Sequence, residues 1–321
     1  MIFSKKYDRE LRFFSLSLNC LTEESSHPQS VTSSNQKRKT EDSIMVTCKR
    51  TKFLKTYYQQ NFSMPDSIIF YIAKNPKTAA LYLKMVKTCK YFFVKNQIIV
   101  IDHLQTSYGK WMVKEKPLDL TKYNCKYWIT DEICVSASES VDKNILLPII
   151  PKLYQCDVKR LYLFSQVVSF NDLSLLILSA ERIHFNNIIV KKCDSVIPLE
   201  DIITIAVNAK TVYAHKPKIT PKTMKQLLQI PHFATLVHFG LYALSEVFDI
   251  EAFYSYMKKN QHTKFYISFF PQPSDAFKNR LETIIDEILE TEQFNYKPPQ
   301  IRFSGLDFQK YEKLRRICNS H

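Results

Sequence analysis

Apolar residues follow a helical spacing through the stretch 64–93. In its first half they lie one, three and four residues apart, which places them on one face of a helix. These residues are Ile68, Ile69, Ile72 and Ala73. Ser63 is suited to cap this helix, Pro65 to its first turn, and Asp66 to its positive end. We therefore predict a helix that begins here and ends at the interruption of Asn75 and Pro76.

A second apolar run follows that interruption and predicts one or two further helices. Its members are Leu81, Leu83, Met85, Val86, Cys89, Phe92 and Phe93. A segment of this length cannot bury so many apolar side chains within itself. We therefore predict a small helical domain at residues 59–105, whose surplus apolar surface is covered by a partner or by the rest of the chain. The short apolar run 96–103 is predicted to cap this domain.

The chain beyond Ile149 alternates between short strand patterns and capped helix patterns. The predicted strands are Arg160–Phe164, Arg182–Phe185, Thr211–Ala214, Val237–Leu241, Lys264–Phe269 and Gln300–Phe303. The predicted helices are Leu173–Leu178, Ile202–Ala206, Met224–Leu228, Phe253–Met257, Phe277–Leu289 and Tyr311–Ile317. Because one strand-helix unit cannot bury both its faces, repeated units are expected to stack. The fold class is therefore α/β, with residues 148–321 resembling an irregular leucine-rich-repeat horseshoe.

An open sheet of this kind exposes alternate residues of each strand on its concave face. Strand parity places Tyr162, Phe164, His184, Tyr213, His238, Gly240 and Tyr266 on that face. It places Leu161, Leu163, Ile183, Phe185, Val212, Phe239 and Ile267 in the core, and a slip of one residue would exchange the two sets. Tyr and His combine apolar area with a polar tip, which suits contact residues. The predicted target-binding residues are Tyr162, His184, Tyr213, His238 and Tyr266. The alternative is that these rings pack under neighbouring loops.

Two further regions complete the predicted organisation. Residues 106–147 contain aromatic and β-branched strand patterns around Trp111 and Trp128, and are predicted to connect the helical domain to the repeats. Residues 1–58 are predicted to be a mostly disordered basic tail. Its basic clusters have the spacing of a bipartite nuclear import signal. The residues concerned are Lys37, Arg38, Lys49, Arg50 and Lys52; a solvated basic run is the alternative.

Composition narrows the possible functions. The net charge of +14 is spread over every segment, so it suits a basic surface or an acidic partner as well as nucleic acid. The eight cysteines show no framework or CxxC spacing, which predicts reduced thiols in the cytoplasm or nucleus. No apolar run reaches the length of a membrane span, so we expect no membrane association. Only three glycines occur, which excludes phosphate-binding loops and dinucleotide fingerprints.

No local constellation of catalytic residues is present. The carboxylates fall at predicted helix starts and polar helix faces, and the histidines lack a partner at the spacing that zinc requires. Cys89 lies in the apolar run and is interpreted as a small core residue. We therefore predict that the protein is not an enzyme and uses no metal or cofactor, although residues distant in sequence could still assemble a site.

The segment that begins at Met64-Pro65 resembles an F-box. Met64-Pro65 stands where the family usually has Leu-Pro, Ile72 matches its first-helix isoleucine, and Val86, Cys89 and Phe92 echo its Val-Cys-Lys-aromatic ending. The sequence departs from the pattern at Met64, at Ser67, where an acidic residue is usual, and in the two residues that separate Val86 from Cys89. The C-terminal region contains short sequences, such as 230–233 and 303–306, that resemble those of the F-box families expanded in nematodes.

The resemblance implies a helical trio that docks on the adaptor subunit of a cullin-RING ubiquitin ligase. The residues expected to dock are Met64, Pro65, Ile68, Ile69, Ile72, Leu83, Val86, Cys89 and Phe92. Our first hypothesis is a substrate-recognition subunit of an SCF-type ligase, whose repeat domain binds an unknown protein target. A second is an interaction scaffold outside the ligase, which the departures from the F-box pattern favour. A third is a basic nuclear protein that binds nucleic acid, which steep salt dependence would indicate.

Overall fold

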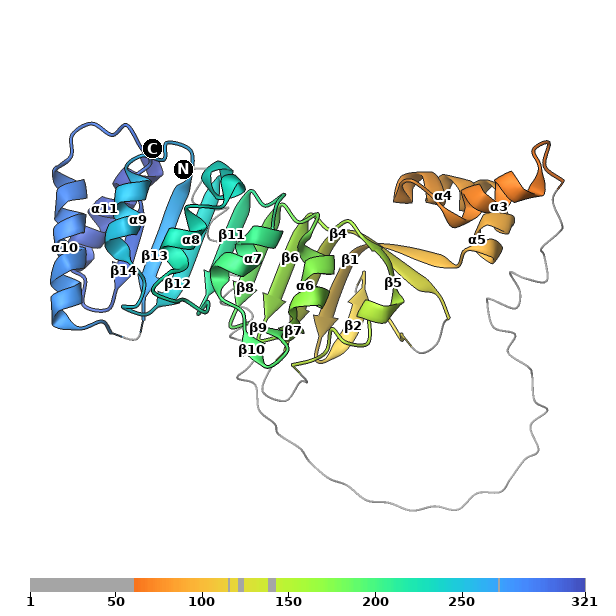
Figure 1. The fold of residues 1–321 in the computed structure, drawn as a ribbon, viewed down its shortest axis with the longest axis horizontal. Helices are drawn as coiled ribbons and strands as arrows, with labels where there is room; N and C mark the ends of the chain where they lie inside the picture. Colours follow the sequence, from red (N-terminus) through yellow and green to blue (C-terminus); the bar gives the residue numbers. More distant parts are fainter. Residues whose placement is uncertain (1–60, 115, 121–123, 138–142, 271, 321) are drawn as a thin grey trace, which may run out of the picture. The chain divides into compact units, whose positions relative to one another are not determined.

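The computed structural model describes residues 61–114, 116–120, 124–137, 143–270 and 272–320. The predicted tail 1–58 and the five residues of the predicted import signal lie outside these ranges. The described chain is a mixed α/β protein built on a large, mostly parallel sheet, with nine α-helices in the described ranges (Figure 1).

The main sheet has eleven strands. From β1 onward its parallel strands lie side by side in chain order, and β2 and β3 extend the sheet beyond β1 as antiparallel neighbours. The strands in spatial order are β14 (Gln300–Phe303), β13 (Lys264–Phe269), β12 (His238–Leu244), β11 (Thr211–His215), β8 (Arg182–Asn186), β6 (Arg160–Phe164), β4 (Lys126–Ser136), β1 (Ile98–Ser107), β2 (Lys110–Val113) and β3 (Lys116–Pro117), with β5 (Leu153–Cys156) paired to β4. Chain-order neighbours that are all parallel require a crossover between each pair.

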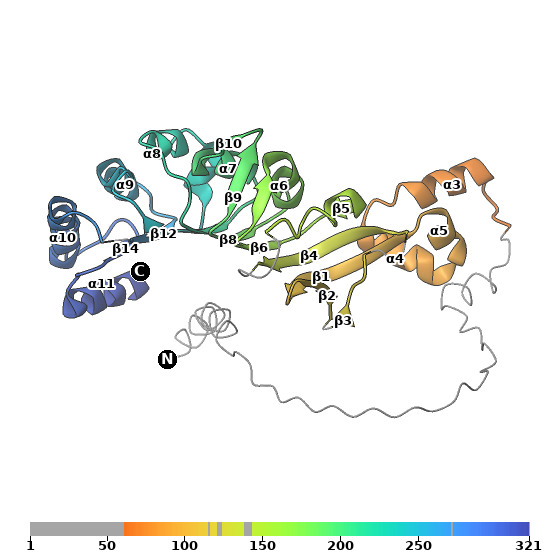
Figure 2. The same cartoon turned by 90° about the horizontal axis from the view of Figure 1, so that it is seen from below.

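Helices supply most of these crossovers, and five of them lie on one face of the sheet (Figures 1 and 2). They are α6 (Phe170–Ile177), α7 (Leu199–Ile205), α8 (Thr223–Leu227), α9 (Ile250–Met257) and α10 (Asp275–Glu290). The last helix, α11 (Phe308–Ser320), lies on the other side of β14 from α10 in Figure 2. We call the sheet face opposite α6 to α10 the open face.

Local capping explains where several helices begin. Asp249 and Ser274 cap α9 and α10, where they accept hydrogen bonds from the backbone N–H groups three residues ahead, at 2.9 and 3.4 Å. The helix α6 begins three residues before the predicted range Leu173–Leu178, because Ser169 caps it and accepts from Asp172 N at 3.0 Å. The first helix also differs: Pro65 occupies the cap position, and Ser63 makes no cap there.

The turn that follows the strand has the same backbone geometry in three successive strand-helix units. Three successive strands end immediately before a residue with positive φ, namely Ser165, Asn187 and Lys216, at 52°, 52° and 53°. Each of these residues donates its backbone N–H to the end of the next strand, at 2.8 to 3.0 Å. The same turn geometry therefore follows these three strands and joins each of them to the next strand of the sheet.

A second, three-stranded sheet lies among the connections near α6. It consists of β7 (Val167–Ser169), β9 (Ile189–Lys192) and β10 (Ser195–Val196), with β9 parallel to β7 and antiparallel to β10. Two 3₁₀ helices, Ile150–Lys152 and Pro231–Thr235, complete other connections. These strands have two to four residues, too short for a clear alternating pattern in the sequence.

The segment before the sheet folds as three short helices. They are α3 (Asp66–Lys74), α4 (Ala79–Thr88) and α5 (Lys90–Lys95), and they belong to the same compact unit as the sheet. Tyr82 of α4 is buried with Ile98 and Trp128, and its hydroxyl donates to the carbonyl of Asn96 at 2.6 Å. The Asn96 side chain in turn donates to the carbonyls of Ala73 and Lys74 at the end of α3, at 3.0 and 3.3 Å.

The main sheet begins earlier than the sequence predicts. The range 96–103, predicted to cap the helical domain, contains the first residues of β1, which pairs with β4. The range 106–147, predicted to be a connector, contributes β2, β3 and β4 to the same sheet. Trp111 and Trp128 are core residues rather than surface ligand anchors. These strands therefore belong to the same sheet that contacts the helices α3 to α5 and carries the open face.

Candidate functional site

The helices α3 and α4 carry a concentration of exposed apolar side chains. Met64 lies two residues before α3, and Ile68 and Tyr71 lie three residues apart on one face of that helix; their side chains are 47%, 47% and 67% exposed. Phe70 of α3 and Leu81 and Leu83 of α4 are also exposed. We call these six residues the apolar patch. Single exposed apolar residues are ordinary, whereas apolar residues that gather on one surface mark binding sites, so we treat these six as a candidate docking surface.

The predicted docking residues divide between this patch and the interior. Met64, Pro65, Ile68 and Leu83 are exposed, whereas Ile69 is 3% exposed and packs inward with Ala73. The others are half-buried, and Val86 packs against the cluster of Tyr82, Ile98 and Trp128. These half-buried residues are Ile72, Val86, Cys89 and Phe92. The predicted docking set omitted Phe70, Tyr71 and Leu81, although Tyr71 follows Ile68 at a helical spacing of three residues.

The open face carries the side chains that strand parity predicts. The residues predicted to point inward are all buried, whereas their neighbours are mostly half-buried on the opposite side of the strands. The strand register then aligns one residue from each strand in a single row. This central row is Cys134, Tyr162, His184, Tyr213, Gly240, Tyr266 and Gln300. The predicted target-binding residues Tyr162, His184, Tyr213 and Tyr266 lie in it, and His238 lies in the adjacent row.

The rings of the central row contact one another across the strands. The His184 ring lies 4.9 Å from that of Tyr162 and 4.8 Å from that of Tyr213, and the Tyr213 and Tyr266 rings lie 6.0 Å apart. Gly240 separates these last two residues in the row. A Cβ at Gly240 would lie 2.3 Å from Cδ1 of Tyr213, so the Tyr213 ring occupies the space of the missing side chain. Glycine at this position therefore allows the row of rings to continue.

Charge is distributed unevenly over the open face. At one end, Arg160 pairs with Asp131 at 2.7 Å and with Glu132 at 2.9 Å, and His103 lies 3.1 Å from Asp131. From β8 to β14, however, the described open-face positions include no carboxylate. They include the cations Arg182, Lys264 and Arg302. At these described strand positions, cations therefore outnumber carboxylates, which gives this part of the face a positive charge.

The histidines of β8, β11 and β12 have lowered pKa values, which favours their neutral form. Burial, followed by the nearby Arg182 charge, lowers the pKa of His184 to about 4. The pKa values of His215 and His238 are also lowered, mainly by burial and then by neighbouring lysines. Burial raises the pKa of Tyr162, while a hydrogen bond from Arg182 opposes the shift. Near neutral pH the positive charge of the face therefore comes from Arg and Lys, and the rings supply neutral polar tips.

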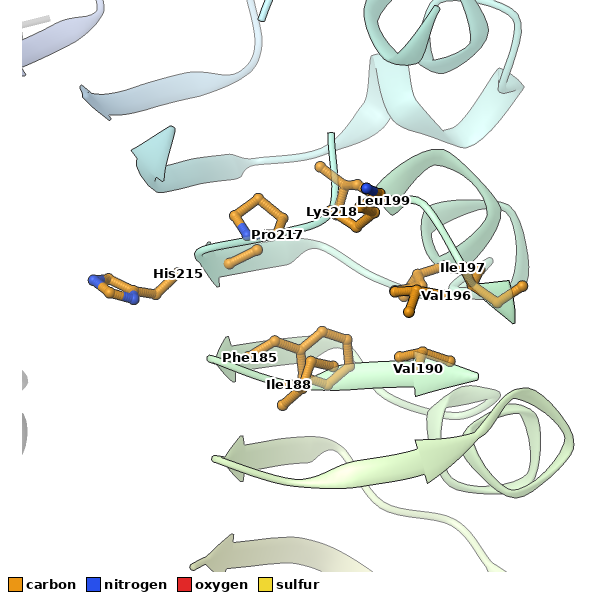
Figure 3. A pocket seen from close by; sticks show the side chains of 11 residues that line it. Phe185, Ile188, Val190, Val196, Ile197, Leu199, His215, Pro217 and Lys218 are labelled. Carbon is orange, nitrogen blue, oxygen red and sulfur yellow. The ribbon is translucent and has the colours of Figure 1, made fainter. Parts of the chain in front are cut away.

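Two cavities adjoin these strands. The first is apolar and has a volume of about 20 Å³. Phe185, Ile188 and Val190 line one side of it, and His215 points away from its other labelled side chains (Figure 3). This volume is far below the several hundred Å³ of ligand sites. The second cavity has a volume of about 600 Å³ and lies where β11 to β14 end, beside the start of α11.

The second cavity combines polar groups with aromatic walls. Arg302, Tyr242, Ser268 and His215 reach it from the open-face side of the strands, and Tyr311 reaches it from α11. Arg302 lies over the Tyr311 ring at 5.6 Å, and the Tyr311 hydroxyl accepts a hydrogen bond from Gln300 at 2.7 Å. Sequence reasoning missed this cavity because its walls come from strands and a helix that are distant in the chain.

Other chemistry is limited in the described ranges. They contain no group of three or more His, Cys, Asp or Glu residues arranged to hold a metal ion. Their six cysteines are free, and burial raises the pKa values of Cys134, Cys156 and Cys318 to about 12. None of the helices described combines the length and apolar character of a membrane-spanning segment.

Comparison with known proteins gives no family assignment, so the function is inferred from the sequence and structure of this chain. No protein-family model matches this chain, and no curated protein is significantly similar to it.

Proposed function

We propose that this protein is the substrate-recognition subunit of an SCF-type cullin-RING ubiquitin ligase. In this proposal, the helices α3 to α5 dock on the adaptor subunit and the open face of the sheet binds a protein target. The chemistry of ubiquitin transfer belongs to other subunits. The observation that carries the proposal is the apolar patch of α3 and α4, which the described chain leaves exposed.

The helices α3 and α4 are suited to docking because their buried residues hold them in place while the residues of the apolar patch remain exposed. Ile69 and Ala73 pack inward, and Tyr82 attaches α4 to the sheet, so the helices are held without the patch. Met64, just before α3, and Ile68 and Tyr71, on its outer face, remain exposed. Burying one such side chain at an interface contributes about 1.5–3 kcal/mol. Several of them buried together would have to offset the translational and rotational freedom lost on association.

The finer fold assignment is part of the same proposal. Three short helices that follow Met64-Pro65 are what an F-box-like domain requires, and the recurring strand-turn-helix unit is what an irregular leucine-rich-repeat-like array requires. The resemblance of Ile72, Val86, Cys89 and Phe92 to the F-box pattern supports the first of these. We propose a cytoplasmic or nuclear location, with reduced thiols, for such a protein.

Co-purification with the adaptor tests the proposal. We expect the full chain to retain the adaptor and Ile68→Asp to lose it, because the substitution replaces an exposed apolar side chain of the patch with a carboxylate. Leu175→Asp is the matched control, since Leu175 is a comparably exposed leucine, 56% exposed, on α6. Equal adaptor recovery for both folded variants would refute the proposed docking surface. Absence of adaptor binding by the parent chain would favour a scaffold outside the ligase.

A further inference from the structure

We infer that the open face from β8 to β14 binds an extended acidic segment of a protein, and that the cavity beside Arg302 receives one end of that segment. The inference depends on the proposed function only for the role of the bound segment as a ligase target. It identifies the chemical class of the target, which the proposed function leaves open.

Charge complementarity is the first argument. Arg182, Lys264 and Arg302 project from β8, β13 and β14 onto a face whose described positions on these strands and on β11 and β12 include no carboxylate. On the described strands of the open face, acidic residues occur only at the far end, where Asp131 and Glu132 are already paired with Arg160. An acidic ligand would therefore meet attraction from β8 to β14 and repulsion beyond β6.

The spacing of the cations indicates an extended ligand. Neighbouring strands lie about 4.8 Å apart, so Arg182 and Arg302 are separated by at least about 19 Å across four strand steps. One phosphate or carboxylate can contact only groups within about 3 Å of its oxygens. An extended peptide advances about 3.3 Å per residue, so about six residues cross this distance. A segment with several acidic side chains matches the spacing.

The arrangement of the rings favours a peptide over single-stranded nucleic acid. Nucleic-acid grooves present aromatic faces on which bases stack. Here the His184 ring has a neighbouring ring on each side, at 4.9 and 4.8 Å, so its faces are partly covered. Base stacking on this ring is therefore restricted, whereas Tyr and His side chains also carry polar groups. These groups suit hydrogen bonding to a peptide backbone along its length.

The cavity provides an end point for the segment. Its volume of about 600 Å³ is within the range of ligand pockets. Arg302 is exposed there, and the Tyr311 ring beneath it restricts its guanidinium group. Guanidinium binds carboxylate through two parallel hydrogen bonds. An acidic side chain or a terminal carboxylate is the expected occupant.

Fluorescence anisotropy with the full chain tests the inference. The probe is a labelled peptide of alternating Glu and Ser, about eight residues long so that it spans the cations. The matched peptide of Lys and Ser and a single-stranded oligouridylate serve as comparison ligands. We expect only the acidic peptide to bind well, and its affinity to fall with salt. Each of Arg182→Gln, Lys264→Gln and Arg302→Gln should weaken binding about threefold, and the triple variant about thirtyfold.

Lys225→Gln is the control variant, because it removes an exposed lysine from α8, on the other side of the sheet. It should bind the acidic peptide like the parent. No binding of the acidic peptide by the parent, equal binding by a folded triple variant, or tighter binding of the oligouridylate would each overturn the inference.

Adaptor co-purification, measured on the same samples, separates this inference from the proposed function. Adaptor binding without peptide binding refutes the acidic-segment site alone. Peptide binding without adaptor binding supports the site and refutes the ligase role.

Discussion

Gly240→Ala tests the register and the packing of the central row. Gly240 lies directly opposite Tyr213 on the neighbouring strand, and its φ is not in the left-handed region. On backbone grounds alone, alanine should stabilise the protein by about 0.4–1 kcal/mol, because it restricts the unfolded chain. The added Cβ would, however, lie 2.3 and 2.7 Å from two carbons of the Tyr213 ring.

The size of the effect follows from these opposing terms. Forcing one extra carbon into an occupied site costs about 1–3 kcal/mol. We therefore expect Gly240→Ala to destabilise the protein by about 1–2 kcal/mol. In a Tyr213→Ala background the two shortest contacts are removed and only the 3.1 Å contact with Tyr242 Cε2, the far part of a side chain, remains. The same substitution should then stabilise by up to about 0.5 kcal/mol. The sign of the effect should thus reverse, with a coupling of about 2 kcal/mol between the two positions.

Urea unfolding followed by circular dichroism measures this double-mutant cycle. Gly305→Ala provides the control, because Gly305 has a φ of 100° and nothing within 4 Å of an added Cβ. Its cost, about 1 kcal/mol from the left-handed backbone, should be the same in both backgrounds. If Gly240→Ala had the same effect with and without the Tyr213 ring, the packing described here would be wrong.

Two further predictions concern buried polar groups. Tyr82→Phe should lower the free energy of unfolding by about 1 kcal/mol, because it leaves the Asn96 carbonyl without its 2.6 Å hydrogen bond; unchanged urea midpoints would contradict this. The pKa of His184 is about 4 in the folded state and about 6.5 in the unfolded state, so acidification protonates the unfolded chain first. Its contribution to stability is therefore complete above about pH 6.5 and is lost as the pH falls towards 4. His184→Gln should reduce the loss of stability between about pH 7 and about pH 5 by up to about 2 kcal/mol, and an equal loss in both proteins would contradict the burial of this ring.

Local patterns predict the repeated part of the fold well. The bounds of β6, β13 and β14 agree with the sequence prediction, because each strand alternates between apolar and polar residues and is bounded by a turn. The same alternation assigns Tyr162 and His184 to the open face. The predicted 277–289 helix forms within α10, where its inward residues follow a helical period and Ser274 caps its start.

Features that depend on distant contacts could not be predicted in this way. The run 98–101 is continuously apolar, so its pattern does not distinguish a strand from a helix, and its partner β4 follows some thirty residues later. The exposure of Phe70 and Tyr71 depends on which surfaces the rest of the chain covers. The role of Gly240 becomes clear only when the register places it beside Tyr213. The cavity at Arg302 likewise requires the return of α11 towards the ends of the strands.

Amide hydrogen exchange with and without the adaptor tests the central claim most directly, because it locates the binding surface on the intact chain. The account predicts that the adaptor slows exchange in α3 and α4, within residues 66–88, and leaves α6 to α10 unchanged. Protection confined to the repeats, or no protection anywhere at saturating adaptor, would contradict it.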